Sequence, residues 1–215
     1  MRCVLTGLRR AANLLCLALP ISLVDVGAAP AAAASCASMA GLALPDTTIT
    51  AAEPVAAGTY TAPDGEVFTD LPAFCRIAAT LTPTPDSDIK IEVWMPYTGW
   101  NGRYLGTGNG GIGGHIIYLT LAHLLSFNYV VANTDMGTSP AFTDPLGGRV
   151  LTGHPEKQID YATRSTNLMT VRAKQIIKLR TILSYQQRGT KQEHTAVSVD
   201  LNDGAQPGAI SKGAQ

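Results

Sequence analysis

A glycine-rich stretch places the tightest limit on how this 215-residue chain can fold. The stretch reads Gly106-Thr107-Gly108-Asn109-Gly110-Gly111-Ile112-Gly113-Gly114. Glycine adopts positive φ at little cost and lets backbone N–H groups converge on an anion. The stretch follows a short strand pattern at 103–107 and precedes a helix pattern at 116–127. A continuous apolar run at 129–133 comes next and is typical of a buried parallel strand.

The patterns around this loop predict an α/β fold. Residues 75–82 form a strand candidate, and residues 89–95 alternate apolar and polar side chains with the period of a half-buried strand. A helical pattern resumes after Pro155 and persists to about Gln187, and 195–199 is a last short strand candidate. Strand, glycine loop, helix, strand, helix, strand is the order of a parallel sheet with right-handed crossovers.

The first 35 residues have the pattern of a secretory signal peptide, which would be removed from the mature protein. A basic start is followed by an apolar run at 11–24 and by small residues that fit cleavage near Ala34. The apolar run is shorter than the roughly 20 residues that a transmembrane helix needs. We therefore expect a secreted or periplasmic product without a membrane anchor.

Charge and cysteine content further limit the function and the cellular compartment of the protein. The whole chain has 16 basic and 16 acidic residues, so no basic surplus points to nucleic acid. Without the leader, 13 basic and 15 acidic residues remain, a net charge of −2. Two cysteines also remain, Cys36 and Cys75, and an even pair in an oxidising compartment predicts a disulfide. The alternative is a lipid-modified Cys36 at the cleavage point.

The sequence divides the remaining chain into three parts. Residues 36–70 form a turn-rich N-terminal segment with only short strand-like pieces at 47–50 and 59–61. Residues 71–200 form the α/β domain, and 201–215 read as a disordered or divergent tail. Within the tail, Ser211 imitates a nucleophile motif, but no helix can follow it in the two residues after Gly213.

The glycine loop by itself is compatible with several chemistries. Gly106 to Gly111 match the dinucleotide fingerprint, and Asp135 lies 24 residues after the last of these glycines. A phosphate-binding Walker loop is excluded because no Gly-Lys-Ser/Thr follows. An oxyanion loop of a hydrolase, or a tight turn without chemistry, remains. The histidines lack zinc-site spacing, so the sequence predicts no metal site; they are His115, His123, His154 and His194.

Eight short strings between about Cys75 and Lys178 resemble one family in their order and spacing. The first four are Phe74-Cys75-Arg76, Ala78-Ala79-Thr80-Leu81-Thr82-Pro83, Ser87-Asp88-Ile89-Lys90-Ile91-Glu92-Val93-Trp94 and Trp100-Asn101-Gly102-Arg103-Tyr104-Leu105-Gly106. The others are Gly108-Asn109-Gly110-Gly111, Thr134-Asp135, His154-Pro155-Glu156-Lys157-Gln158-Ile159-Asp160 and Met169-Thr170-Val171-Arg172-Ala173-Lys174. Together they resemble the tannase and feruloyl esterase family of secreted serine carboxylic ester hydrolases.

The resemblance implies an incomplete α/β-hydrolase-like parallel sheet and cleavage of esters of gallic, ferulic and related aromatic acids. By matching position, Gly110 and Gly111 fall in the family's oxyanion loop. Cys36 and Cys75 correspond to its N-terminal disulfide. The family's calcium site lies in a lid region that this chain does not reach, so no cofactor is expected.

Some positions depart from the family pattern. After Asp135 the family usually continues with Gly-His, whereas this chain has Met136-Gly137-Thr138, and Asn167 stands near a usual histidine. A loose alignment of 195–199 with the family's nucleophile strand puts Asn202 where the serine belongs, and Asn cannot attack an acyl carbon. We therefore expect an N-terminal portion of an aromatic-ester hydrolase that is inactive alone. The alternative is a secreted, non-catalytic ligand-binding module.

Overall fold

The computed structural model describes residues 35–111, 113–139 and 149–189. Five strands form one sheet in the order β1-β4-β5-β7-β6, and β2 and β3 form a separate pair. The strands are β1 Thr47–Val55, β2 Gly58–Thr61, β3 Val67–Leu71, β4 Phe74–Leu81, β5 Ile89–Pro96, β6 Tyr104–Thr107 and β7 Val130–Thr134. The helical elements are η1 Ser38–Gly41, α2 Tyr118–Ser126, η3 Arg149–Leu151, α3 Pro155–Ile159, η4 Asp160–Arg164 and α4 Ser165–Gly189.

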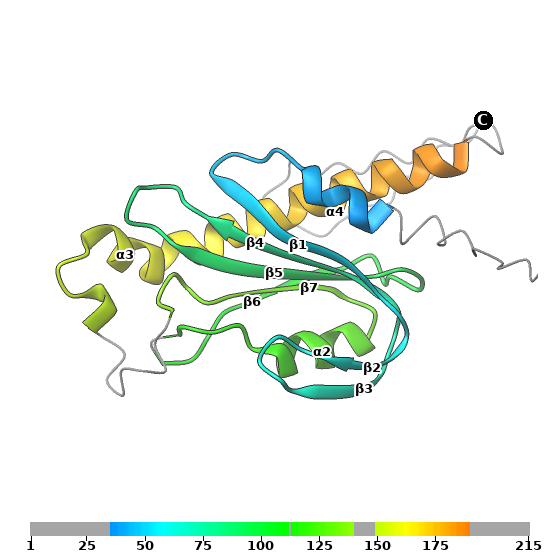
Figure 1. Ribbon diagram of the computed structural model, residues 1–215, viewed down its shortest axis with the longest axis horizontal. Coiled ribbons are helices and arrows are strands. Elements are labelled where there is room, and N and C mark those ends of the chain that lie inside the picture. Colours follow the sequence, from blue (N-terminus) through cyan, green and yellow to red (C-terminus); the bar gives the residue numbers. More distant parts are fainter. Residues whose placement is uncertain (1–34, 112, 140–148, 190–215) are drawn as a thin grey trace, which may run out of the picture.

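Helices cover both faces of the five-stranded sheet (Figure 1). On one face, η1 and α4, which contributes Met169, pack against buried residues of the central strands, among them Ile77 and Ile91. On the other face, α2 and the β2–β3 pair enclose an aromatic core around Phe74, Trp94 and Tyr118. The expected α/β-hydrolase type of architecture is therefore confirmed, with each face of the sheet shielded from water.

The sheet is mixed, and among the described strands only β6 and β7 pair in parallel. The pairs β1–β4, β4–β5 and β5–β7 are antiparallel. Connection length explains the directions of two pairs, β4–β5 and β6–β7, because parallel neighbours need a crossover of a dozen or more residues. The short turn between Leu81 and Ile89 permits only a hairpin, whereas α2 supplies the crossover from β6 to β7. β1 comes from the turn-rich N-terminal segment and tolerates Pro54 because it is the outer strand.

The helical pattern after Pro155 is interrupted rather than continuous. Residues 160–164 form a π-helical turn between α3 and α4. The guanidinium of Arg164 donates hydrogen bonds to Asp160 at 2.8 Å and to Glu156 at 2.7 Å. These two acidic residues, which the sequence places on one helix turn, therefore share a cation. The π turn also carries Tyr161, whose phenol contacts the glycine loop at Gly111.

The expected disulfide joins Cys36 to Cys75, with 5.6 Å between the Cα atoms. Both cysteines are fully buried, and the bond ties the start of the described chain to β4. A cysteine in a disulfide has no thiol for the lipid attachment considered for Cys36. On the chain-entropy account, a loop of this length contributes about 3–4 kcal/mol to stability.

A buried carboxylate connects the sheet to α2. Glu92 on β5 accepts hydrogen bonds from both Nε and Nη2 of Arg76 on β4, the former at 2.9 Å. It also accepts from the indole N–H of Trp94 at 2.8 Å and from the phenol of Tyr118 at 3.0 Å. Arg76 extends its other nitrogen to Glu53 on β1, 2.9 Å away. The network thus spans three neighbouring strands and the first residue of the helix.

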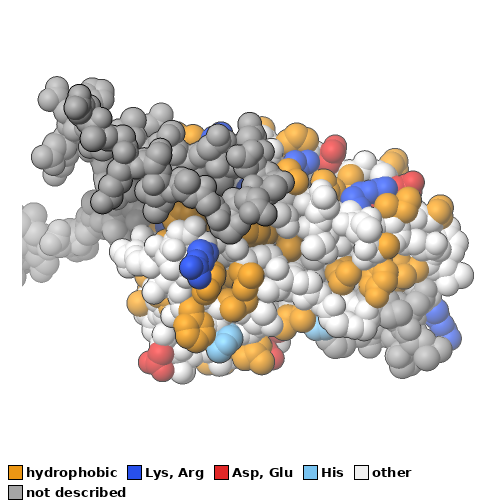
Figure 2. Space-filling view, turned by 180° about the vertical axis from the view of Figure 1, so that it is seen from behind, with side chains coloured by type: hydrophobic (Ala, Val, Ile, Leu, Met, Phe, Trp, Pro, Cys, Tyr) orange, Lys and Arg blue, Asp and Glu red, His pale blue; other side chains and the backbone are white. Residues whose placement is uncertain are grey.

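Three large apolar side chains on or beside β3 and α2 are exposed. Val67, Leu119 and Phe127 are 60%, 63% and 57% exposed. In the view from behind, hydrophobic side chains gather near a histidine at the lower end of the molecule (Figure 2). Among the described helices, none is both long enough and apolar enough to cross a membrane.

Replacing Glu92 with Gln tests the buried network. The substitution leaves the Arg76 guanidinium buried beside a neutral amide, so we expect a loss of about 3 kcal/mol in the free energy of unfolding. Urea denaturation followed by circular dichroism measures the loss. Glu53→Gln is the matched control, because the Glu53 side chain is 54% exposed and its removal should cost less than about 1 kcal/mol. Equal losses for the two variants would contradict the role assigned to Glu92.

Candidate active-site loop

The glycine stretch forms a loop at the carboxyl end of β6, beside β7. Gly111 and Gly113 adopt φ of 61° and 71°, a left-handed conformation that side chains rarely adopt. A Cβ atom at Gly113 would also lie 3.2 Å from the carbonyl oxygen of Asp135. Position 113 therefore requires glycine for two reasons. The turn needs a positive φ, and the backbone of Asp135, just after β7, passes close by.

Asn133 holds the beginning of the loop. It is fully buried at the end of β7, and its amide nitrogen lies 2.9 Å from the hydroxyl of Thr107 and 3.2 Å from the carbonyl of Gly108. Its Oδ1 accepts the backbone N–H of Ile117 at 2.8 Å, just before α2 begins. One side chain therefore fixes the exit from β6 and the entry to α2. The sequence signal for this role of Asn133 is a polar residue near the end of an otherwise apolar strand.

The middle of the loop is held by Asn109 and by Tyr161 from the π turn. The amide of Asn109 donates to the carbonyls of His115 and Thr134, both at 2.7 Å. The phenol of Tyr161 donates to the carbonyl of Gly111, also at 2.7 Å. Sequence reasoning missed Tyr161, because a contact 50 residues away in the chain leaves no local pattern.

Asp135 anchors the far end of the loop. Its carbonyl accepts the N–H of Gly114 at 2.9 Å. Its Oδ1 accepts the N–H groups of Lys90 and Gly137, both at 2.8 Å. Burial raises the pKa of Asp135 to about 6, against the opposing effect of these hydrogen bonds. Met136 at φ 61° and Gly137 at φ 71° make the sharp turn that returns Gly137 to the carboxylate.

The environment of Asp135 argues against the dinucleotide interpretation of the loop. In that fold the acidic residue reaches out to a ribose hydroxyl. Here Asp135 is 1% exposed, and one of its oxygens is already engaged by two backbone N–H groups. The formal match to the fingerprint therefore does not create the ribose contact that dinucleotide binding requires.

The two central glycines of the loop lie at the surface. Gly110 and Gly111, the residues expected to form the oxyanion loop, are both exposed. Among the hydrogen bonds between described residues, none uses the N–H of Gly110 or of Gly111, while both of their carbonyls are engaged. The arrangement can stabilise negative charge on a bound oxygen through neutral donors that need no rearrangement.

The structure describes only some of the other candidate groups. Asn202 and Ser211 lie outside the described residues. Within the described ranges, no three His, Cys, Asp or Glu side chains lie close enough to hold a metal ion. His154 lies 2.9 Å from Asp86 in an exposed pair at the start of α3. The described part of the chain therefore contributes backbone donors at this site.

Known proteins share both the sequence and the fold. Residues 75–190 match the family model for tannase and feruloyl esterase. An uncharacterized esterase of Xanthomonas campestris pv. campestris is 44% identical over 130 residues, which cover 60% of this chain and 22% of that protein. A probable feruloyl esterase B-2 of Neosartorya fischeri is 32% identical over 154 residues, covering 68% of this chain and 28% of that protein.

The fold agrees with a solved member. The crystal structure of feruloyl esterase B from Aspergillus oryzae superposes with a TM-score of 0.63 at 28% identity, over 71% of this chain and 30% of that one. The chain thus spans less than a third of the length of each of these relatives. The family match covers more than half of the chain, from the disulfide cysteine of β4 to the end of α4. The chain therefore belongs to the tannase and feruloyl esterase family.

Proposed function

We propose that this chain supplies the oxyanion loop of a serine carboxylic ester hydrolase that acts on esters of aromatic acids. One observation carries the proposal: the exposed Gly110 and Gly111 follow a parallel strand, and hydrogen bonds engage their carbonyls while leaving their N–H groups available. The activities for which the family is named, those of tannase and feruloyl esterase, support ester hydrolysis and motivate the aromatic substrate class.

In ester hydrolysis the carbonyl oxygen becomes negatively charged as the nucleophile attacks. Donors that already point at the position of this oxygen stabilise the transition state more than the substrate. In this chain, Asn109, Tyr161 and Asp135 take up the loop's remaining contacts, which leaves the N–H groups of Gly110 and Gly111 available. Each donor of this kind contributes about 10²–10³ in rate in hydrolases that have been tested by mutation.

The proposal includes secretion of the protein. The buried disulfide between Cys36 and Cys75 supports an oxidising compartment, because cytosolic proteins keep their thiols reduced. The basic and then apolar pattern of the first 35 residues supports the same assignment.

We expect the 215-residue chain, assayed by itself, not to hydrolyse methyl ferulate or methyl gallate. The glycine loop contributes backbone donors, and such donors alone give only a small fraction of a complete triad's rate. Release of the free acid, followed by chromatography, is the measurement. Hydrolysis at rates ordinary for an esterase would show that the nucleophile lies within this chain.

Binding of a tetrahedral anion tests the loop directly, without requiring turnover. Phenylphosphonate imitates the charge and shape of the intermediate, so it should shift the amide resonances of Gly110 and Gly111 in nuclear magnetic resonance spectra. Gly110→Pro removes one donor and should weaken binding about tenfold or more.

Gly110→Ala is the matched control, because it keeps the N–H and an added Cβ meets no atom within 4 Å. Its affinity should remain close to that of the parent chain. The oxyanion assignment fails if phenylphosphonate leaves both glycine amides unchanged, or if the Pro and Ala variants bind it equally well.

Replacing Asp135 with Asn should change how stability depends on pH. Because burial raises the pKa of Asp135 to about 6, the folded chain binds this proton more tightly than the unfolded chain does. The stabilisation of the folded chain by this proton is fully present below pH 4 and is lost as the pH rises through about 6. The free energy of unfolding of the parent, relative to that of Asp135→Asn, should therefore fall by about 2–3 kcal/mol between pH 4 and pH 7.5.

Urea denaturation of both proteins at each pH measures their free energies of unfolding. The contributions of the other titrating groups cancel when one free energy is subtracted from the other. A difference that stays constant across this range would mean that Asp135 titrates alike in the folded and unfolded chain.

A further inference from the structure

A groove lies between β3 and α2, on the face of the sheet opposite α4. Its volume is about 350 Å³, and most of the side chains that line it are apolar. Val67 on β3 and Leu119 on α2 are 60% and 63% exposed within it. Phe127 extends the apolar surface beyond the end of α2, where its ring packs edge-on against that of His123, 5.2 Å between centroids. The oxyanion proposal uses none of these residues.

The Lys, Arg, Asp and Glu side chains of the two segments that form the groove are all acidic. Asp64 and Glu66 precede β3 and Asp70 lies near its end, and all three are exposed. Among the ion pairs between described residues, none involves these carboxylates. Residues 58–71 and 115–128 contain no Lys or Arg. Figure 2 shows acidic side chains at the lower margin of the hydrophobic patch and one basic side chain above it.

The spacing of the carboxylates matches a short extended peptide. Asp70 comes four residues after Glu66, which corresponds to at most about 13 Å along a strand. An extended peptide of about five residues covers the same distance. Basic side chains at its two ends can therefore reach both carboxylates while the apolar side chains between them enter the groove.

We propose that this groove binds a short segment of a partner protein that has apolar side chains flanked by Lys or Arg. The apolar side chains lie between β3 and α2 and cover Val67 and Leu119, which removes exposed apolar surface from water. The basic side chains lie at Glu66 and Asp70, and their charge selects this partner over neutral or acidic segments. The site is independent of the proposed ester hydrolysis.

The same carboxylates argue against two other occupants of the groove. A second copy of this chain, placed by a two-fold axis, would bring like charges from Glu66 and Asp70 together. A membrane surface carries anionic lipids, which the carboxylates repel. A cationic protein segment is the occupant that both the apolar lining and the charge favour.

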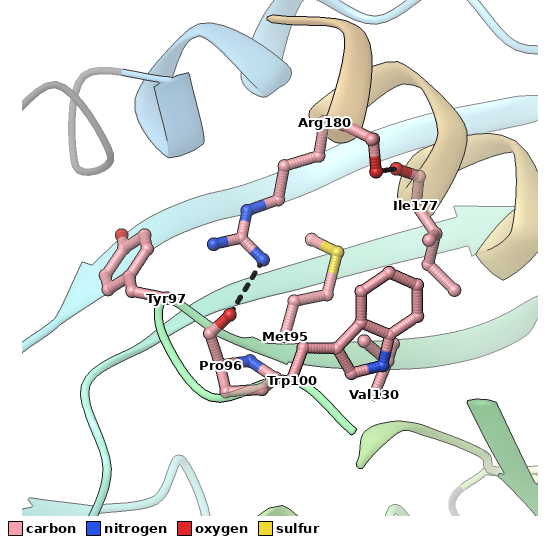
Figure 3. Close-up of a pocket in the computed structure, with 8 residues that line it drawn as sticks. Met95, Pro96, Tyr97, Trp100, Val130, Ile177 and Arg180 are labelled. Carbon is pink, nitrogen blue, oxygen red and sulfur yellow. Dashed lines mark hydrogen bonds between the residues drawn. The ribbon is translucent and has the colours of Figure 1, made fainter. Parts of the chain in front are cut away.

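A smaller pocket on the other face of the sheet provides a reference for binding experiments. Its volume is about 160 Å³, and Val130 and Ile177 are among the residues that line it. Arg180 reaches into it from α4 and donates to the carbonyl of Pro96 at 3.1 Å (Figure 3). The methyl resonances of Val130 and Ile177 therefore report on a part of the molecule that a peptide in the groove does not touch.

The probe is the peptide acetyl-Lys-Phe-Ser-Leu-Lys-amide, titrated into the full 215-residue chain and followed by nuclear magnetic resonance. It should shift the methyl resonances of Val67 and Leu119 and leave those of Val130 and Ile177 unchanged. The dissociation constant should lie in the millimolar range that suits so short a peptide. Acetyl-Glu-Phe-Ser-Leu-Glu-amide reverses the charge, and acetyl-Lys-Ser-Ser-Ser-Lys-amide removes the apolar side chains. Each should bind at least about tenfold more weakly.

Asp70→Asn should weaken binding of the first peptide about threefold, the effect of one exposed ion pair. Asp46→Asn is the matched control, because both aspartates are exposed and adopt a positive φ, 59° at Asp70 and 48° at Asp46, which Asn tolerates. Asp46 lies just before β1, outside the groove, so its replacement should leave the affinity unchanged. Leu119→Ser removes exposed apolar surface and should weaken binding about fivefold or more.

The proposal is overturned if the first peptide leaves the methyl resonances of Val67 and Leu119 unmoved, or if either matched peptide binds as tightly. These comparisons use the parent chain and hold whether or not the variants fold. Equal affinities of the folded Asp70→Asn and Asp46→Asn variants would also overturn it. Dimerisation in sedimentation experiments, or binding to phosphatidylserine–phosphatidylcholine vesicles, that Leu119→Ser abolishes would assign the groove to a second copy or to a membrane instead.

Discussion

The buried carboxylate of Glu92 is the contact on which the rest of the described structure depends. A carboxylate that is 3% exposed is costly unless hydrogen-bond donors surround it. Arg76, Trp94 and Tyr118 supply those donors from two strands and a helix. Burial and the neighbouring Glu92 raise the pKa of Tyr118, so its phenol stays protonated and donates. Because α2 begins at Tyr118, the network also fixes where the glycine loop must end.

The loop itself is held by side chains rather than by its own backbone. Asn133 joins the exit of β6 to the entry of α2, and Asn109 and Tyr161 engage carbonyls around the central glycines. Hydrogen bonds engage the carbonyls of the two exposed glycines, Gly110 and Gly111, and none of the hydrogen bonds between described residues uses their N–H groups. Rigid support behind exposed donors is the physical requirement for stabilising a developing negative charge, since donors that must reorient lose much of their effect.

Much of the fold could be predicted because its signals are local. The alternation at Ile89–Pro96 and the apolar run at Val130–Thr134 are strands in the structure, and the helix pattern after the glycines is α2. Strand direction could not be read so simply, because it depends on how far apart paired segments lie in the chain. The short β3 carries too little alternation to be recognised, and the π turn at Asp160–Arg164 becomes visible only through its buried contacts.

The sequence by itself determined the class of fold, the pairing of Cys36 with Cys75 and the place of the glycine loop, since each rests on residue type and spacing. Only the tertiary structure decided what surrounds that loop. The burial of Asp135, the reach of Tyr161 and the pocket around Arg180 join residues that are distant along the chain. Their energies arise from desolvation and from long-range contacts, which exist only after the sheet and its helices have packed.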